Sequence, residues 1–452
     1  MSEFSVRGQQ VVVVGGARSG VSAARLLVDR GASVTLTDLR PAIDSADELA
    51  KAGVTLVLGS HPAGLFDAAD LVVLSPGVPL SQPALLAART RGVPIIGEVE
   101  LAFRWLRGRV IAVTGTKGKS TTTALTGTIL EQAGHHVLVG GNIGRPLSGQ
   151  VGASTPDSIH VVEVSSFQLE TADTFHPWIA ALLNLTADHL DRHANRQEYA
   201  DAKARIFARQ TEADWAVVNA DDPQTLELAR RGRARLRQFS LRTDAAEADV
   251  IVAGEYVVER DGGQDTPLVR TSDVKLLGTH LMADVLAAAA IARLANVPPA
   301  PIAAAVSAFR GLEHAMEWVD QIDGVRYVND SKATNIDAAG QAIATFGDGL
   351  VVVMGGRFKG GDFGSLRASL VARRAIVVAI GEATPLILAA LGTDICVIAA
   401  TSMADAVAAA RKAASGGGTV LLAPACASFD MFTDYAARGR AFKDEVSRLR
   451  SV

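Results

Sequence analysis

Cysteine is scarce in this sequence: Cys396 and Cys426 are the only two among 452 residues. Two cysteines cannot build a four-cysteine metal site or a disulfide framework, which argues against zinc-ribbon and disulfide-scaffold proteins. The first ten residues, MSEFSVRGQQ, also lack the basic start and apolar run of a secretory signal. We therefore expect a protein that works in the cytoplasm.

Long apolar runs and an excess of one charge are missing too. The apolar stretches, such as Val11–Val14 and Ile376–Ile380, have the length of a strand, whereas a helix that crosses a bilayer needs about 20 apolar residues. Lys and Arg number 44 against 48 Asp and Glu, so the net charge is only −4. This balance gives no electrostatic reason to expect nucleic acid or an anionic membrane as a partner. We expect small-molecule partners, with no nucleic acid and no membrane insertion.

The sequence does have a regular alternation of β-branched runs with Ala- and Leu-rich helical segments. This alternation is typical of parallel sheets with helical crossovers, and at about 150 residues per domain the length suggests three domains. We predict an α/β chain with an N-terminal Rossmann-like domain (1–97), a central P-loop ATPase-like domain with a mostly parallel sheet (98–311) and a C-terminal Rossmann-like domain (312–452). Residues 213–277 are expected to form an antiparallel edge, and the strands of the third domain to begin near Val325.

The segment Val113–Thr121, VTGTKGKST, has the character of a phosphate-binding loop. It is tighter than the strict G-x-x-x-x-G-K-[ST] pattern, but it follows a β-branched strand and precedes a helical segment. In that setting backbone N–H groups and the helix N-terminus face the phosphates. Lys119 would hold the β- and γ-phosphates, and Ser120 or Thr121 would bind Mg²⁺. The segment predicts an enzyme that uses ATP or a close relative.

A second glycine-rich turn, Gly15–Gly20, follows the first expected strand and opens a helix. It is a degraded G-x-G-x-x-G in which Ala17 replaces the middle glycine, and Asp38 stands at the spacing of a ribose acceptor. A nicotinamide dehydrogenase is therefore a competing class, although it needs no second phosphate loop. The same turn suits the diphosphate of another nucleotide, including one attached to the substrate. Ser75–Gly77 is a further loop at the same sheet edge, or a plain turn.

Polar side chains also follow two central strands. Glu163 ends a buried strand, where ligands of α/β sheets bind, and it is a candidate ligand of Mg²⁺. Asn184, Asp188 and His189 follow the next strand and are candidates to bind a second metal or to orient an acyl phosphate, or they are strand caps. Lys203 lies in a helical segment, and composition alone predicts a surface lysine.

Six motifs in this order, TGTKGKST, GGNIG, EVSSFQLE, DHLDRH, NDSKATN and ACASFDMF, resemble the Mur ligases over essentially the whole chain. Asn329–Asn335 and Ala425–Phe432 resemble the members of that family that add D-glutamate. The resemblance implies an ATP-dependent, ADP-forming amide ligase of peptidoglycan precursor synthesis. It would join D-glutamate to UDP-N-acetylmuramoyl-L-alanine through an acyl phosphate, as a monomer in the cytoplasm.

The resemblance also implies where the substrates bind. The UDP group would be held by residues of the first domain: Gly15, Arg18, Ser19, Asp38, Arg40, Ser75 and Gly77. ATP would bind the phosphate loop and one residue of the third domain: Gly115, Thr116, Lys117, Gly118, Lys119, Ser120, Thr121 and Asp330. The muramoyl part and D-glutamate would contact the remaining set: Asn142, Ser165, Lys332, Thr334, Lys359, Ser428 and Phe429.

The metal site and the catalytic residues overlap in this family. Mg²⁺ would be held by Ser120, Glu163, His189 and Lys203, the last as a carbamate that supplies a carboxylate to the metal. Lys119, Glu163, His189 and Lys203 are the implied catalytic residues.

Three positions depart from the pattern of the family. Leu281 and Asp284 replace two asparagines before the third domain, and Ala315 stands where an arginine is common. We expect the adenine and phosphate contacts from this side to differ from those common in the family, and the change to Ala315 alone removes a charge-assisted contact of roughly 1.5–3 kcal/mol. Two further alternatives remain open: a sister ligase that adds another amino acid, and a nucleotide-binding protein without catalysis.

Overall fold

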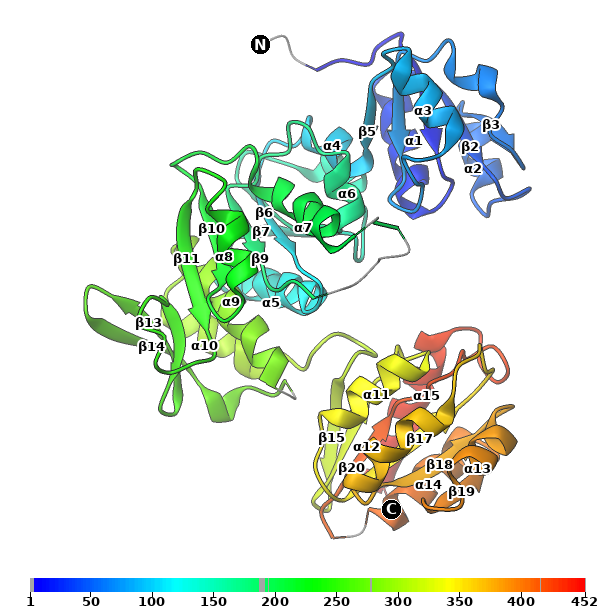
Figure 1. Cartoon of the computed structure of the whole chain (residues 1–452), viewed down its shortest axis with the longest axis vertical. Helices are drawn as coiled ribbons and strands as arrows, with labels where there is room; N and C mark the ends of the chain where they lie inside the picture. The colour runs from blue at the N-terminus through cyan, green and yellow to red at the C-terminus, as the bar shows by residue number, and fades with distance from the viewer. Residues whose placement is uncertain (1–3, 187–191, 194, 277–278, 415, 452) are drawn as a thin grey trace. The chain divides into compact units, whose positions relative to one another are not determined.

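Three separate β-sheets organise the chain in the computed structural model, which describes residues 4–186, 192–193, 195–276, 279–414 and 416–451 (Figure 1). The chain divides into two compact units, one of residues 1–273 with 283–307 and one of residues 274–282 with 308–452. The first unit holds two of the sheets and the second unit holds the third. The predicted α/β class with three domains and mostly parallel sheets is confirmed. The boundaries at 97 and 311 stay a prediction.

The N-terminal sheet has five parallel strands in the order β3-β2-β1-β4-β5. Its strands are β1 (Gln10–Val14), β2 (Ser33–Asp38), β3 (Thr55–Leu58), β4 (Leu71–Leu74) and β5 (Ile95–Gly97). Its helices are α1 (Arg18–Asp29), α2 (Ala46–Lys51), the 3-10 turn η1 (Ala63–Phe66) and α3 (Pro83–Thr90). Apolar side chains of β1 alternate between a core shared with α1 and a core shared with α3, so the sheet is covered on both faces.

The central sheet has nine strands in the order β14-β13-β12-β11-β10-β9-β6-β8-β7. They are β6 (Arg109–Thr114), β7 (His136–Gly141), β8 (Ser158–Glu163), β9 (Ile179–Leu182), β10 (Trp215–Asn219), β11 (Arg235–Ser240), β12 (Val250–Ala253), β13 (Tyr256–Asp261) and β14 (Gln264–Arg270). The helical elements are α4 (Glu98–Phe103), α5 (Lys119–Gln132), η2 (Leu147–Ala153), α6 (Ser166–Glu170), α7 (Arg196–Ala204), η3 (Arg205–Phe207), α8 (Pro223–Ala229), η4 (Thr271–Asp273), α9 (Thr279–Leu294) and α10 (Pro299–Ala308).

The predicted antiparallel edge is shorter than expected. β10 and β11 pair in parallel, with α8 between them, and β12 pairs with β11 in parallel as well. Only β13 and β14 run antiparallel to their neighbours. The prediction for residues 213–277 was therefore wrong for the first part of the segment, because its polar composition concealed another strand–helix–strand crossover.

The C-terminal sheet has six strands in the order β15-β16-β20-β17-β18-β19. They are β15 (Glu317–Ile322), β16 (Val325–Asn329), β17 (Leu350–Gly355), β18 (Ile376–Ile380), β19 (Val397–Ala400) and β20 (Thr419–Leu422). The helical elements are α11 (Ile336–Ala344), η5 (Phe363–Leu366), α12 (Arg367–Ala372), α13 (Thr384–Leu391), α14 (Met403–Ala413), α15 (Tyr435–Arg448) and η6 (Leu449–Ser451).

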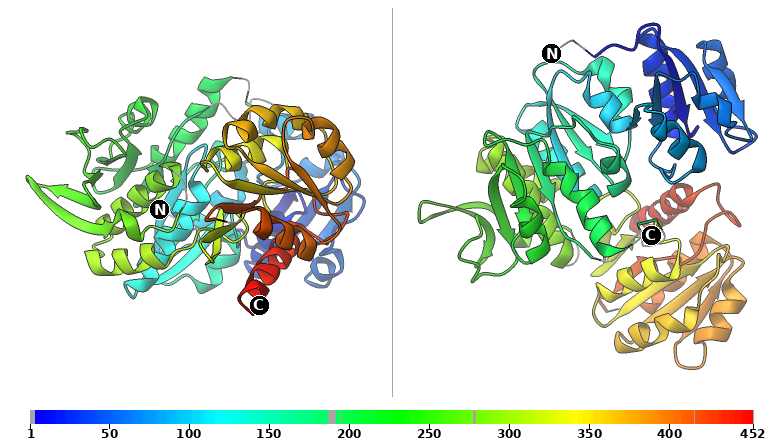
Figure 2. Two further views of the ribbon diagram at one scale, coloured as in Figure 1. Left: turned by 90° about the horizontal axis from the view of Figure 1, so that it is seen from below. Right: turned by 45° about the horizontal axis from the view of Figure 1, so that its top comes forward.

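Helices cover both faces of this last sheet, as both views of Figure 2 show. One core packs α11, α12 and α13 against it, and the other packs α14 and α15. The strands begin with β15, one strand earlier than the start predicted near Val325, and β15 pairs with β16 in antiparallel fashion. Across the whole described part of the chain, no helix combines the length and apolar character that crossing a membrane requires.

Candidate active site

The phosphate loop joins β6, which ends at Thr114, to α5, which begins at Lys119. Gly115 and Gly118 have positive φ angles of 156° and 81°, in the region that favours glycine. A Cβ atom on Gly118 would stand 2.0 Å from Oδ1 of Asp284, so a larger residue at this position would force the Asp284 side chain to move. The predicted order of strand, glycine loop and helix is present, and it directs the N-terminus of α5 at the loop.

Asn184, which follows β9, holds this loop by its side chain. Its Oδ1 accepts hydrogen bonds from the backbone N–H groups of Thr116 (3.1 Å) and Lys117 (2.9 Å). Its Nδ2 donates to the carbonyl oxygen of Lys117 at 3.1 Å. These bonds use both ends of the amide, so Asn184 braces the loop, and a role as metal ligand is not supported. Its sequence neighbours Asp188 and His189 lie outside the described residues.

Lys119 lies on the first turn of α5 and turns back toward the loop. Its Nζ donates a hydrogen bond of 2.8 Å to the carbonyl oxygen of Thr116. The ammonium group is therefore held at the loop, together with the N–H groups at the start of the helix. This is the placement that a lysine needs to neutralise nucleotide phosphates.

Glu163 contacts two residues that belong to two other sequence motifs. It ends β8 and is only 2% exposed. Ser120 Oγ donates to its Oε2 at 2.6 Å, and Asn142 Nδ2 donates to its Oε1 at 2.8 Å. A hydroxyl and a carboxylate in contact are the hard oxygen donors that suit Mg²⁺. In the described ranges, no group of three or more His, Cys, Asp and Glu side chains forms a metal cluster.

Lys203 is buried, contrary to what composition predicted. It lies on α7, is 2% exposed, and its Nζ donates to the carbonyl oxygen of Gly115 at 2.8 Å and to Thr114 Oγ1 at 3.3 Å. The same Nζ lies 4.8 Å from the ring centre of Tyr199. Packing against the phosphate loop therefore keeps this amine buried beside Thr114 and Gly115.

Ser165 begins α6 as its N-cap. Its Oγ accepts from the backbone N–H of Gln168, and Gln168 Oε1 accepts from the N–H of Ser165 at 2.9 Å. This reciprocal pair is a capping box. Ser165 therefore has a structural role as a helix cap. The sequence motif alone does not distinguish this role from the expected contact with the substrate.

The turn after β1 is fixed by side chains from the neighbouring strands. Asp38 Oδ2 accepts from the N–H of Gly16 at 2.6 Å, and its two oxygens accept from Arg40 Nε (3.0 Å) and Nη2 (2.8 Å). The Arg40 guanidinium holds the pKa of the Asp38 carboxyl well below its usual range. Ser75 Oγ donates to the carbonyl oxygen of Gly15 at 2.9 Å. Asp38 thus supports the turn and presents Arg40.

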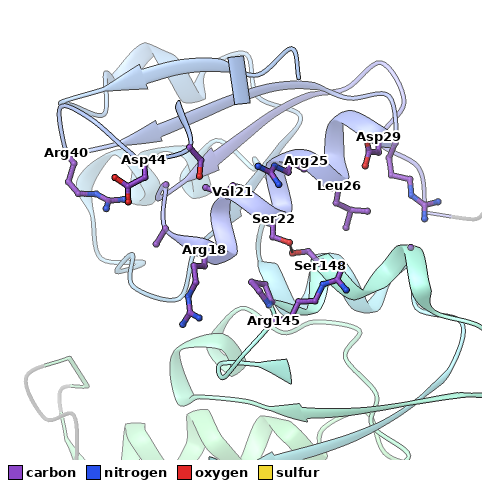
Figure 3. Close-up of a pocket in the computed structure, with 17 residues that line it drawn as sticks. Arg18, Val21, Ser22, Arg25, Leu26, Asp29, Arg40, Asp44, Arg145 and Ser148 are labelled. Atoms are coloured by element: carbon purple, nitrogen blue, oxygen red, sulfur yellow. Dashed lines mark hydrogen bonds between the residues drawn. The ribbon is translucent and has the colours of Figure 1, made fainter. Parts of the chain in front are cut away.

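A cavity of about 840 Å³ opens beside this turn, within the first unit (Figure 3). One face of α1 lines one side, and the segment after the GGNIG motif lines the other. Figure 3 shows Arg40 and Asp44 at one end, Asp29 at the other, and Arg18, Arg25 and Arg145 along the length. Five arginines against two aspartates line the cavity, which favours an anionic ligand: Arg18, Arg25, Arg30, Arg40 and Arg145.

Arg145 is a residue that the sequence reasoning missed. It directly follows Gly144, the last glycine of GGNIG, and Arg18 Nη1 donates to the carbonyl oxygen of Gly144 at 3.3 Å. The signal was a basic residue next to a recognised motif. Without the fold, nothing indicated that this residue shares a cavity with the glycine-rich turn of the first domain.

In the second unit, the loops after β16 and β20 come together. The backbone N–H of Ala425 donates to the carbonyl oxygen of Ala333 at 2.9 Å, which joins the NDSKATN and ACASFDMF motifs. Burial raises the pKa of Asp330 to about 6, although the N–H of Met316 and the charge of Lys332 act in the opposite direction. This carboxyl therefore keeps its proton to a higher pH than an exposed aspartate does.

The residues expected to bind D-glutamate lie on these two loops and, for Lys359, on the loop after β17, and their exposure differs. Lys359 Nζ donates to Thr334 Oγ1 at 3.4 Å. Ser428 is buried, whereas the ring of Phe429 is 62% exposed.

Arg438, on α15, is a second residue that the sequence did not reveal. Its guanidinium is buried, and it donates to Ser331 Oγ (3.0 Å), to the carbonyl oxygen of Ser331 (2.9 Å) and to that of Cys426 (3.1 Å). Burial lowers its pKa to about 10. Arg438 therefore connects the two motif loops by hydrogen bonds. No motif in the sequence of α15 indicates this role.

Three family models match the chain in consecutive segments. They are the Mur ligase MurD-like N-terminal domain over residues 9–97, the Mur ligase middle domain over residues 113–292, and the Mur ligase glutamate ligase domain over residues 315–426.

Individual relatives agree with the family models. The chain is 44% identical to the UDP-N-acetylmuramoylalanine–D-glutamate ligase of Acidobacterium capsulatum, over 99% of this chain and 98% of that one. It is 42% identical to the enzyme of the same name from Pelotomaculum thermopropionicum, over 98% of each chain. The structure of MurF ligase from Thermotoga maritima in complex with ADP superposes with a TM-score of 0.57 at 16% identity, covering 99% of this chain and 97% of that one, and supports the fold.

Proposed function

The chain belongs to the Mur ligase family, and on that premise we propose that it joins D-glutamate to UDP-N-acetylmuramoyl-L-alanine at the expense of ATP. The relatives that match nearly the whole chain carry this activity in their names. The observation that carries the proposal in the structure is the contact of Ser120 and Asn142 with Glu163 beside the phosphate loop. This contact supports the proposal because it joins the phosphate loop, two oxygen donors that suit a divalent cation and a predicted substrate residue.

The phosphate loop supplies the groups that transfer of a phosphoryl group needs. The N–H groups at the start of α5 and the ammonium group of Lys119 face the position of the phosphates. Mg²⁺ would be held by Ser120 and Glu163, with His189 and Lys203 as the further ligands that the resemblance implies. When bound, the metal supplies positive charge that offsets the charge of the transferred phosphoryl group.

The chemistry follows from the poor reactivity of a carboxylate. ATP transfers its γ-phosphoryl group to the free carboxylate of the L-alanyl substrate, which gives an acyl phosphate and ADP. The amine of D-glutamate then attacks the acyl carbon, a C–N bond forms, the C–O bond to phosphate breaks, and the amine loses a proton. Both steps gain mainly from positioning and from charge stabilisation, which the fixed loop and its lysine provide.

Lys203 is the proposed site of a carbamate. Addition of CO₂ to its Nζ would release a proton and convert a buried amine into an anionic group with two oxygens. Burial favours this reaction, because the reacting form of the amine is the neutral one and a charged ammonium is disfavoured in a buried site. The Nζ already lies 2.8 Å from the carbonyl oxygen of Gly115, so the carbamate would form beside the phosphate loop.

In the second unit, the proposed ligands are the ribose of ATP at Asp330 and D-glutamate at the neighbouring loops. The charged and polar groups for the amino acid are Lys332, Thr334, Lys359 and Ser428, and Phe429 adds an aromatic ring. Two cationic side chains suit the two carboxylates of D-glutamate, and a hydroxyl adds a hydrogen-bond donor.

The assay that tests this function measures release of ADP and phosphate with each substrate present or absent. Turnover is expected only with the nucleotide-sugar peptide, ATP and D-glutamate together, because the acyl phosphate needs an amine to complete the reaction. Other amino acids in place of D-glutamate separate this activity from that of a sister ligase. ATP turnover that ignores D-glutamate would contradict the assignment, and NAD binding without ATP binding would revive the dehydrogenase alternative.

The cavity of the first unit is the proposed site of the UDP group, and it provides a test with a clear direction. Replacing Arg145 by alanine is expected to raise the KM for the nucleotide-sugar about 10- to 100-fold with kcat little changed, because a charge-assisted contact contributes about 1.5–3 kcal/mol to binding. Steady-state kinetics at varied nucleotide-sugar concentration measures this. Arg233→Ala, in the exposed turn between α8 and β11, is the matched control. An unchanged KM in Arg145→Ala would remove Arg145 from the proposed site.

The cytoplasmic location and the monomeric state stay predictions.

A further inference from the structure

Asp284 is a buried carboxyl on α9 that lies against the phosphate loop. It is 3% exposed, and its Oδ1 stands 2.0 Å from the position that a Cβ of Gly118 would take. Its Oδ2 is buried and has no hydrogen-bond partner within the part of the chain that the structure describes. A carboxyl group therefore occupies the space beside Gly118, the N-cap of α5, and one of its oxygens has no hydrogen-bond partner among the described residues.

The surroundings of Asp284 do not favour its ionised form. Burial raises its pKa well above the usual range, and only the Thr122 hydroxyl and the charge of Lys119, both from α5, act in the opposite direction. The positive charge of Lys119, on α5, acts on this carboxyl and favours its ionised form. Lys119 is also the residue proposed to bind the phosphates at the loop. The Asp284 carboxyl and a bound nucleotide would therefore both interact with its ammonium group.

The two protonation states of Asp284 would affect nucleotide binding in opposite ways. An ionised carboxylate repels the phosphates and competes with them for Lys119, in a site of low dielectric where such interactions are strong. The neutral acid does neither, and it presents one acceptor and one donor, as an amide does. Phosphates bound at the loop therefore stabilise the neutral acid, and by linkage the neutral acid favours nucleotide binding.

We propose that Asp284 is a positioning residue of the ATP site which acts in its neutral form, so that binding of the nucleotide is coupled to uptake of one proton by this side chain. The proposal rests on the proposed function only for the identity of the nucleotide. The sign is fixed: affinity is highest at low pH, where the carboxyl of the free protein is already protonated, and falls as pH rises and the free protein loses that proton.

Calorimetric titration of the full-length protein with Mg²⁺ and ADP tests the proposal, at several pH values and in buffers with different enthalpies of ionisation. For the natural protein we expect affinity to fall by up to tenfold per pH unit once Asp284 titrates, with up to one proton taken up. Asp284→Asn has the same shape and cannot titrate. Its affinity for ADP is expected to depend less on pH, and it is expected to take up fewer protons on binding. Protonation of ADP itself contributes equally to both proteins, so it cancels when the variant is compared with the natural protein.

Equal proton counts and parallel pH curves for the natural protein and Asp284→Asn would overturn the proposal. If Asp284→Asn fails to fold, Asp284→Ala provides the second comparison. A natural protein that takes up no proton beyond those accounted for by ADP would by itself contradict the proposal. Absence of nucleotide binding by the natural protein would overturn the ATP site and the proposal together. Binding of ADP with the expected proton uptake, but without D-glutamate-dependent turnover, would support Asp284 and contradict the proposed function.

Discussion

Replacing Lys119 by methionine is expected to lower kcat/KM for ATP by about 10²- to 10³-fold, the cost of removing one preorganised group that stabilises charge in a transition state. The ammonium group is held on the first turn of α5, 2.8 Å from the carbonyl oxygen of Thr116, so it lies at the loop before the nucleotide arrives. Methionine keeps the length and the apolar part of the side chain and removes only the charge. Release of ADP at varied ATP concentration measures the effect.

The control for this experiment is Lys412→Met, which makes the same chemical change at an exposed position on α14. Both variants are expected to unfold at the temperature of the natural protein, because neither lysine is part of an apolar core. A Lys119→Met protein that keeps more than a tenth of the natural kcat/KM would show that the loop does not serve phosphoryl transfer.

Replacing Lys203 by alanine is the second large effect, with an expected fall in kcat of about 10²- to 10³-fold. Alanine removes the hydrogen bonds to Thr114 and Gly115 and the amine that would carry the carbamate. Lys203→Arg separates these two roles, because arginine restores a positive charge and donors but forms no carbamate with CO₂. We expect the arginine variant to be as impaired as the alanine variant.

Two further measurements address the carbamate directly. Removal of bicarbonate at mildly acidic pH should lower the activity of the natural protein, because protonation of the amine favours loss of CO₂, and added bicarbonate should restore it. With ¹³C-labelled bicarbonate, a carbamate carbon signal is expected in the natural protein and absent in Lys203→Ala. A natural rate in Lys203→Arg, or activity indifferent to bicarbonate with no such signal, would assign Lys203 a purely structural role.

The sheets could be predicted wherever their strands are buried. The run of valines in β1 and the apolar run of β17 are typical of such strands, because both faces of these strands are covered. β15 and β19 escaped prediction because they are edge strands, and their half-exposed residues alternate too weakly to separate them from loops. The parallel pairing of β10 and β11 was missed for a different reason. β11 is an interior strand, but Arg235, Arg237 and Gln238 give it a polar sequence that does not look like a buried strand.

The site was predictable where its residues lie within one motif, and unpredictable where packing brings them in. The strand, loop and helix at Lys119 followed from local sequence, and so did Glu163 at the end of its strand. Burial of Lys203 depends on how α7 packs against the loop, which composition does not encode. Arg145 and Arg438 act across large distances in the sequence, and no local pattern distinguishes them from surface arginines.

The three hydrogen bonds from Asn184 have a consequence for the catalytic cycle. They tie the phosphate loop to the end of β9, in the middle of the central sheet, so the loop becomes ordered when the domain folds. A nucleotide then meets a surface already in its binding shape, and little conformational entropy is lost on binding. The same loop keeps its form when ADP leaves, so successive turnovers start from the same receptor and no refolding step separates one round from the next.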